Sequence, residues 1–389
     1  LPLRASSELN YEIIEKSKKI LLDRLRNQGF LDAHIEYKIV PLIHNDKKEN
    51  NTSWYELHFY LRPGKKIQIK TITIIGNILT HESVVYNSLT FTLNSTVTQS
   101  QIDTSYHDLF NLNLFNDIDI QRYPDLIQKE KNHLYIFLRE QKPQSIEIGG
   151  GLGTEDGIRS SIKYEHANIG GYDIKLSARA TANYKLFFFL YGEPLASAAY
   201  NRFMVLPLAD RIEREIGLGL NYPRVYGFSK NTSLFGDIVN LRNNALFYSE
   251  EESKLILGLS HRVTPPINIT VQNNVELSNL QCFEAYHTTT YSFREGCGWL
   301  TTVRNKLESG SYIYDIVSSS LSFDFRNDRF FPSKGLFFSF SWQKAFSLNT
   351  AGADYNKLEG MTNFYLPVFG PLQIALSLKS GKIITLPND

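Results

Sequence analysis

The chain has 389 residues, with 41 Lys and Arg against 40 Asp and Glu. This near-neutral balance gives no basic footprint, so a nucleic-acid partner is not expected. Aromatic residues make up 13% of the chain although its mean hydropathy is negative, a combination typical of a membrane β-barrel with a polar lumen. No apolar run reaches the roughly eighteen residues of a transmembrane helix. The chain opens without Met or a visible signal peptide, and we expect it to be mature or truncated.

The first 64 residues predict part of a small α/β module. Residues 8–28 have a helical period and stop at Gly29, which tolerates the left-handed conformation at helix ends. Two alternating strands follow, one ending near Val40 and one at 54–61. Residues 1–64 are therefore predicted to hold one helix and two strands.

The next segment, 65–142, predicts a more complete module. A strand ends at Gly76, and a short helix follows at about 82–89. Thr98 and Gln101 have the spacing of a capping box at the start of a second helix. Two strands, at 116–123 and 133–140, complete the order β-α-α-β-β.

From residue 143 to residue 389 apolar and polar side chains alternate with the period of two that β-strands have. Segment 183–211 is the exception and is predicted to be an extended loop with strand extensions. About eleven strands are predicted, near 145–153, 158–165, 174–181, 212–222, 229–243, 253–262, 266–282, 312–326, 335–347, 354–367 and 371–384.

The hairpin at 316–342 favours a membrane barrel. Each arm holds about ten alternating residues, enough to cross a bilayer core when tilted. Phe330, Phe331 and Trp342 lie near its ends, where aromatic girdles form. A long soluble hairpin would alternate in the same way and remains the alternative. In a barrel we expect Asp324 and Arg326 to face inward, and these residues to face outward: Leu255, Leu257, Leu321, Phe323, Phe338, Phe340, Ile374 and Leu376.

The strand at 145–153 is predicted to be weakly held, because glycine loses more conformational freedom than other residues when it is ordered. Its residues of interest are Glu147, Gly149, Gly150, Gly151 and Gly153. We predict that this strand opens at its outer edge as a lateral gate. Curvature at a barrel seam is the alternative explanation of the glycines. Phosphate binding is not expected, since neither a helix nor a Lys-Ser/Thr pair follows the glycines.

Two cysteines, Cys282 and Cys297, fall in one polar stretch. We predict that they lie in the same outward loop and close it by a disulfide in an oxidising compartment. Two free thiols remain the alternative.

Four stretches carry a resemblance to a known family. The segment from Asp324 and Arg326 to Pro332 and Gly335 resembles the Asp-x-Arg…Pro-x-x-Gly strand-and-turn signature of the BamA/TamA superfamily of outer-membrane insertases. Gly-Phe-Leu-Asp-Ala in the first module and Ile-Thr-Ile-Ile-Gly-Asn in the second are similar to the POTRA domains of that superfamily. The glycine-rich run and the Tyr-Glu-His-Ala-Asn-Ile-Gly-Gly that follows it resemble the opening hairpin of a TamA-type barrel.

The resemblance implies an architecture for the whole chain. Residues 1–64 would be a partial POTRA module, 65–142 a complete POTRA module, and 143–389 the N-terminal part of a transmembrane barrel. In the family that the chain resembles, sixteen strands close the barrel, so the eleven predicted here would not close it. The Val-Arg-Gly-Phe-type motif of a later inward loop is absent here, so we expect a chain truncated at both ends. Two visible modules favour a TamA-like member over a BamA-like one.

The same resemblance implies an assembly and translocation factor in the bacterial outer membrane, with its POTRA modules in the periplasm. The implied partners are unfolded barrel or autotransporter clients, the lipid bilayer, and a periplasm-spanning protein at the POTRA modules. A two-partner-type secretion pore, which passes its client through the lumen, is the alternative.

An enzyme is not expected, because the catalytic and metal-binding patterns are missing from the sequence. The nearest match to a nucleophile elbow, around Gly227 and Ser229, lacks the second glycine. The nine His are scattered, and none pairs with another His or with Cys at the spacing of metal ligands. We therefore expect neither a catalytic residue nor a metal or cofactor.

Overall fold

The computed structural model describes residues 9–42, 54–125, 127, 131–153, 157–185, 205–225, 229–244, 248–282, 309–350, 352–369 and 372–385. The chain divides into two compact units, Leu1–Gln141 and Lys142–Asp389. No helix of the described residues is both long and apolar enough to cross a bilayer.

The first unit begins with α1 (Tyr11–Arg26), whose N-cap Asn10 accepts from the backbone amides of Glu12 and Ile13. An antiparallel hairpin of β1 (His34–Leu42) and β2 (Trp54–Arg62) follows. Gly29, just after α1, has φ +94°, and a Cβ there would lie 2.5 Å from the Thr96 side chain. The glycine predicted to end this helix is therefore required both by its backbone conformation and by its surroundings.

The remaining elements of this unit have the order predicted for residues 65–142. They are β3 (Gln68–Ile75), α2 (Glu82–Ser88), α3 (Gln99–Phe110), β4 (Phe115–Pro124) and β5 (Lys131–Glu140). The sheet order is β3-β5-β4, with β3 parallel and β4 antiparallel to β5. Val84, Leu109 and Ile136 are fully buried between the helices and the sheet. The capping box of Thr98 and Gln101 is present at the start of α3.

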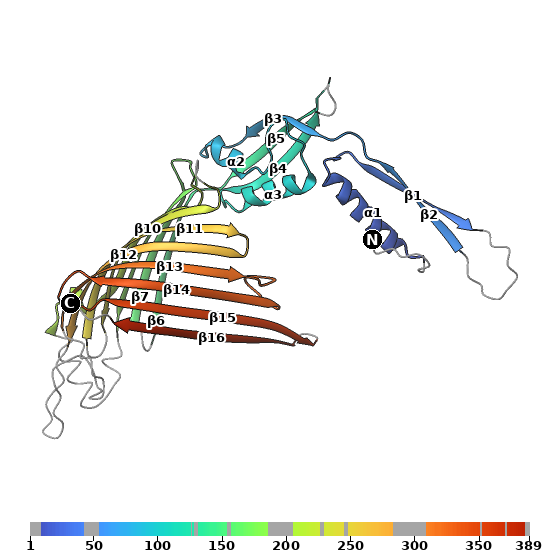
Figure 1. Ribbon diagram of the computed structural model, residues 1–389. Coiled ribbons are helices and arrows are strands. Elements are labelled where there is room, and N and C mark those ends of the chain that lie inside the picture. Colours follow the sequence, from blue (N-terminus) through green and yellow to red (C-terminus); the bar gives the residue numbers. More distant parts are fainter. Residues whose placement is uncertain are drawn as a thin grey trace. The chain divides into compact units, whose positions relative to one another are not determined.

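The described residues of the second unit form one antiparallel sheet of eleven strands, in which strands adjacent in sequence are also adjacent in space (Figure 1). Its order, β6 to β16, confirms the predicted strand number. The strands are β6 (Gln144–Gly153), β7 (Gly157–Ile169), β8 (Ile174–Tyr184), β9 (Glu213–Tyr222), β10 (Thr232–Asn244), β11 (Tyr248–Thr264), β12 (Ile267–Cys282), β13 (Gly310–Asp324), β14 (Gly335–Ser347), β15 (Tyr355–Phe369) and β16 (Leu372–Thr385).

One prediction for this unit is wrong. A single helical turn, α6 (Leu208–Arg211), interrupts the segment 183–211 that was expected to be extended. Pro207 precedes the turn with φ −52°. Proline is favoured at helix starts because its fixed φ suits the helix and it has no amide to leave unpaired.

The two faces of the sheet differ as the alternation predicts. On the apolar face Leu255 lies opposite Ile238 and Val275, and the rings of Phe323 and Phe338 are 6.1 Å apart. Of the eight residues expected to face outward, five are exposed (Leu255, Leu257, Phe340, Ile374 and Leu376) and three are half-buried (Leu321, Phe323 and Phe338). The opposite face, called the polar face, carries ion pairs such as Arg179–Glu215 at 2.7 Å.

Candidate functional site

Strand β6 forms one edge of the sheet. In the part of the chain that the structure describes, it pairs only with β7, from Gln144 opposite His166 to Gly153 opposite Gly157. All of its residues are exposed, and Ile148 and Leu152 on the apolar face are both 81% exposed. An edge of this kind presents a row of backbone N–H and C=O groups that another strand can pair with. An edge of this kind can accept a further strand by backbone pairing.

The predicted gate residues Glu147, Gly149, Gly150, Gly151 and Gly153 all lie on this strand. None of the four glycines has a positive φ. A Cβ at Gly151 would meet no atom within 4 Å, and one at Gly150 would lie 3.9 Å from the nearest atom. Neither position therefore needs glycine for a turn or for close packing against the described residues, and weak holding of this strand stays a prediction. Gly149 differs, because its Cβ would lie 2.6 Å from the Ser161 hydroxyl.

Glu147 lies on the polar face, opposite Lys163. The Lys163 ammonium is instead 2.8 Å from Glu165 on its own strand. Exposed ion pairs of this kind contribute little to stability, about 0–1 kcal/mol. The ion pair beside β6 therefore adds little to the stability of this strand.

The family signature lies in the turn between β13 and β14, far from β6 in sheet order. Arg326 binds both carboxylate oxygens of Asp324, with Nε 2.8 Å from Oδ1 and Nη2 2.9 Å from Oδ2. Arg329 Nε lies 3.4 Å from the same carboxylate. These side chains are 14% exposed at Asp324 and 18% at Arg326, and Asp324 lies opposite Phe337 on the polar face. Their predicted inward orientation is thus present, and their observed role is to fix the turn.

Two further residues complete this turn. Gly335 has φ +120°, and a Cβ there would lie 2.3 Å from the Phe325 carbonyl oxygen, so only glycine fits. Pro332 lies within the turn, where a missing backbone donor costs no ladder bond. The Asp328 carboxylate accepts from the amides of Phe331 and Phe330, and these hydrogen bonds hold its pKa below the usual range. The signature therefore encodes a rigid reversal, as its residues predicted.

The predicted disulfide lies outside the described residues. Cys282 is the last residue of β12, but its side chain and the segment that holds Cys297 are not described. The bridge stays a prediction.

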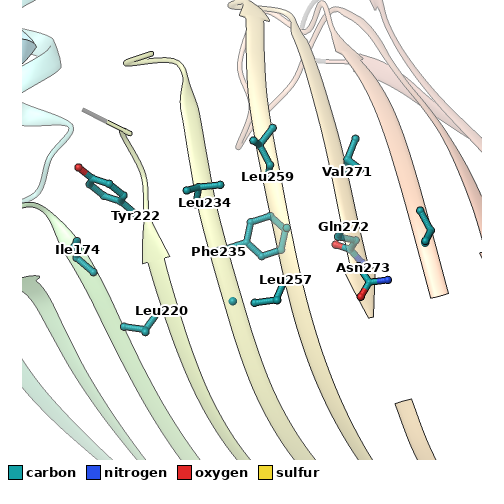
Figure 2. A pocket seen from close by; sticks show the side chains of 13 residues that line it. Ile174, Leu220, Tyr222, Leu234, Phe235, Leu257, Leu259, Val271, Gln272 and Asn273 are labelled. Atoms are coloured by element: carbon teal, nitrogen blue, oxygen red, sulfur yellow. The ribbon is translucent and has the colours of Figure 1, made fainter. Parts of the chain in front are cut away.

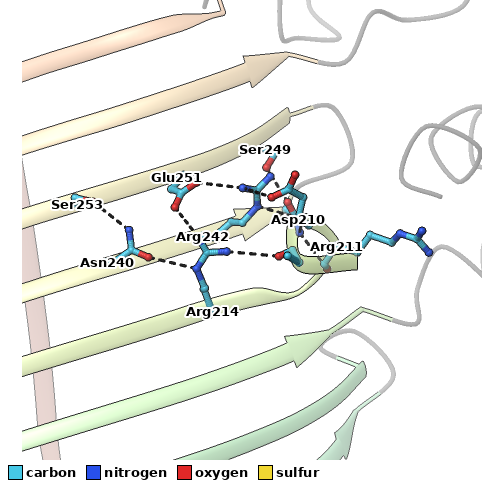
Figure 3. Close-up of polar contacts among 10 residues, drawn as sticks. Asp210, Arg211, Arg214, Asn240, Arg242, Ser249, Glu251 and Ser253 are labelled. Atoms are coloured by element: carbon cyan, nitrogen blue, oxygen red, sulfur yellow. Dashed lines mark hydrogen bonds and ion pairs between the residues drawn. The ribbon is translucent and has the colours of Figure 1, made fainter. Parts of the chain in front are cut away.

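A polar cluster on the apolar face was missed by the sequence analysis (Figure 3). Arg242, only 8% exposed, lies 2.9 Å from Asp210 of α6 and 3.2 Å from Glu251 of β11. Arg214 of β9 lies 2.5 Å from the same Glu251 and donates to Asn240 of β10. The cluster connects α6 to β9, β10 and β11. It marks the boundary of the apolar surface on these strands. The sequence does hold a signal for this cluster. Its polar residues stand at the alternate positions that continue the apolar face from Ile216, Ile238 and Leu255.

The Omp85 superfamily domain matches residues 142–386. The chain belongs to the Omp85 superfamily. This confirms the superfamily that the strand-and-turn signature indicated. The subtype and the expected truncation are not tested by this match.

Known proteins resemble the chain at low identity. The outer membrane protein assembly factor BamA of Neorickettsia risticii (strain Illinois) is 22% identical over 174 residues, which is 45% of this chain and 22% of BamA. The crystal structure of BamA from Haemophilus ducreyi lacking POTRA domains 1–3 has a TM-score of 0.69 at 14% identity, covering 98% of this chain and 66% of that one. CdiB from Escherichia coli has a TM-score of 0.50 at 10% identity, covering 97% of this chain and 63% of CdiB. These likenesses show the fold alone, in which the described eleven-stranded sheet resembles the BamA barrel without closing. The chain spans less than two thirds of each relative's length.

Proposed function

We propose that this Omp85 superfamily chain is an outer-membrane protein assembly factor that adds unfolded β-barrel clients to the edge of β6. The observation that carries the proposal is an exposed edge strand whose Gly150 and Gly151 are not required by its geometry. The printed name of the Neorickettsia relative, an assembly factor, supports the same function.

The two faces of the sheet support a placement of this unit in the outer membrane. The exposed apolar face would contact the bilayer, and the polar face would line a hydrated lumen. The first unit would then lie in the periplasm as POTRA modules, divided at residues 64 and 65, and bind clients by strand addition. A periplasm-spanning partner at this unit, autotransporter clients and a TamA-like subtype belong to the same proposal. No catalytic step is included in it.

A secretion pore is the second candidate, supported by the charged pairs of the polar face, such as Arg179–Glu215, and by the structural likeness to CdiB. An assembly factor and a secretion pore leave the client in different places.

Full-length protein in liposomes of outer-membrane lipids would be mixed with a urea-denatured barrel client. An assembly factor makes the client fold into the bilayer faster than protein-free liposomes do, measured by its heat-modifiable migration in gels. Client that enters the vesicle interior without folding into the bilayer would establish the pore instead.

A further inference from the structure

A hollow in the apolar face crosses six strands, from Ile174 on β8 to Val317 on β13 (Figure 2). It is an open, shallow hollow with a volume of about 810 Å³. Gly236 of β10 lies opposite Leu220 of β9 and Leu257 of β11. Because glycine has no side chain to fill the space between these two leucines, the hollow is deepest at this point. A Cβ at Gly236 would lie 3.1 Å from the end of Leu257. A long hollow with aliphatic walls suits a hydrocarbon chain.

At one end of the hollow two polar residues, Asn273 and Asp315, occupy positions at which the alternation predicts apolar side chains. Asn273 lines its end and stands between Val271 and Val275 on the apolar face of β12. Its amide donates to Asp315 Oδ1 on β13 over 2.5 Å. A carboxylate on a surface that faces lipid is costly, and such residues are usually retained for binding.

A cation completes the polar end. The register pairs Asp315 with Phe346 and Val317 with Lys344, so Lys344 and Asp315 are diagonal neighbours on one face, about 7–8 Å apart. The Lys344 ammonium lies 4.9 Å from the Phe346 ring centroid. None of the ion pairs found among the described residues joins Lys344 to Asp315, so an anion and a cation stand side by side, each open to a ligand of opposite charge.

We propose that this is a binding site for one phospholipid whose head group carries a primary ammonium beside its phosphate. The ammonium donates to Asp315, the phosphate binds Lys344, and one acyl chain lies in the hollow over Gly236. An anionic phospholipid would place no cation against Asp315 and fits less well. The inference rests on the membrane placement in the proposed function. It adds a specific lipid on the apolar face between β8 and β14, apart from the β6 edge.

Native mass spectrometry of the full-length protein tests the site. The protein would be released from nanodiscs holding equal phosphatidylethanolamine and phosphatidylglycerol, and the retained lipids counted. We expect phosphatidylethanolamine to be retained over phosphatidylglycerol about tenfold, equivalent to about 1.4 kcal/mol. Asp315→Asn, which keeps the shape of the side chain, should abolish this preference. Lys344→Gln and Gly236→Val should reduce the retention of both lipids.

Lys382→Gln on the apolar face of β16, which lies opposite Leu358 of β15, is the matched control and should retain both lipids as the native protein does. Heat-modifiable migration shows that each variant is folded. Equal retention of the two lipids by the native protein, or an unchanged preference in the Asp315→Asn variant, would overturn the inference. Client insertion is measured separately, so a protein that inserts clients without a lipid preference would contradict this site and leave the proposed function intact.

Discussion

Alanine at Gly150 and Gly151 should strengthen β6 and slow client insertion. Both positions have φ values open to any residue, and a Cβ meets nothing closer than 3.9 Å at Gly150 and nothing within 4 Å at Gly151. The substitution therefore brings no clash. Each one removes a conformational cost of about 0.5–1 kcal/mol. The pair should stabilise the strand by about 1–2 kcal/mol, which lowers the open fraction about 5- to 30-fold.

Hydrogen exchange on the full-length protein in nanodiscs measures this effect. In the native protein the amides of 144–153 should exchange much faster than those of 335–343 in β14. In the Gly150→Ala, Gly151→Ala variant exchange at 144–153 should slow by the same 5- to 30-fold and that at 335–343 should not change. Gly360→Ala is the matched control, because Gly360 lies in the interior strand β15 and its Cβ would also meet nothing within 4 Å. Equal protection of β6 and β14 in the native protein would refute the reasoning and leave curvature as the role of the glycines.

Three further predictions concern turns. Gly335→Ala should destabilise the second unit by at least about 1–3 kcal/mol, seen as a lower urea midpoint, because the methyl group would meet the Phe325 carbonyl at a φ of +120°; an unchanged midpoint would be inconsistent with the turn described. Arg326→Lys should reduce the free energy of unfolding by about 1–2 kcal/mol, because it removes the bidentate bond to Asp324. This loss would again appear as a lower urea midpoint, and a midpoint equal to that of the native protein would contradict this role. Asp173, in the turn after β7, is 1% exposed, and burial raises its pKa to about 6 from 3.8. Because the folded pKa is raised, its contribution to stability is complete below about pH 4 and is lost as the pH rises through 6, a change of up to about 3 kcal/mol. Asp173→Asn should remove this loss and raise the midpoint at pH 7.5; an unaltered pH profile would show that another group is responsible.

Local patterns in the sequence predict most of the fold. The strand Gly335–Ser347 was predicted at its observed bounds, since Gly335 starts it and alternation continues to its end. The capping box at Thr98 was predicted for the same reason, because its partners are three residues apart. Strand β11 begins earlier than predicted because Glu250, Glu251 and Glu252 do not alternate in polarity.

Features that depend on strand pairing could not be predicted from local patterns. Arg214 and Glu251 meet only because β9, β10 and β11 are neighbours in a fixed register. Asn273 and Asp315 lie 42 residues apart and meet for the same reason. Their positions could have been noticed as polar interruptions of an apolar series, but their contact requires the register. The edge position of β6 likewise follows from the sheet order.

The central claim, that clients join the edge of β6, is tested most directly by site-specific photocrosslinking in the full-length protein during assembly of a stalled client. A crosslinker would replace Ile148, which is 81% exposed on the apolar face of the edge strand, or Ser161, which lies opposite Gly149 on the polar face of β7. The account predicts a strong client adduct from position 148 and a weak one from position 161. Adducts confined to position 161 would place the client in the lumen and contradict the account.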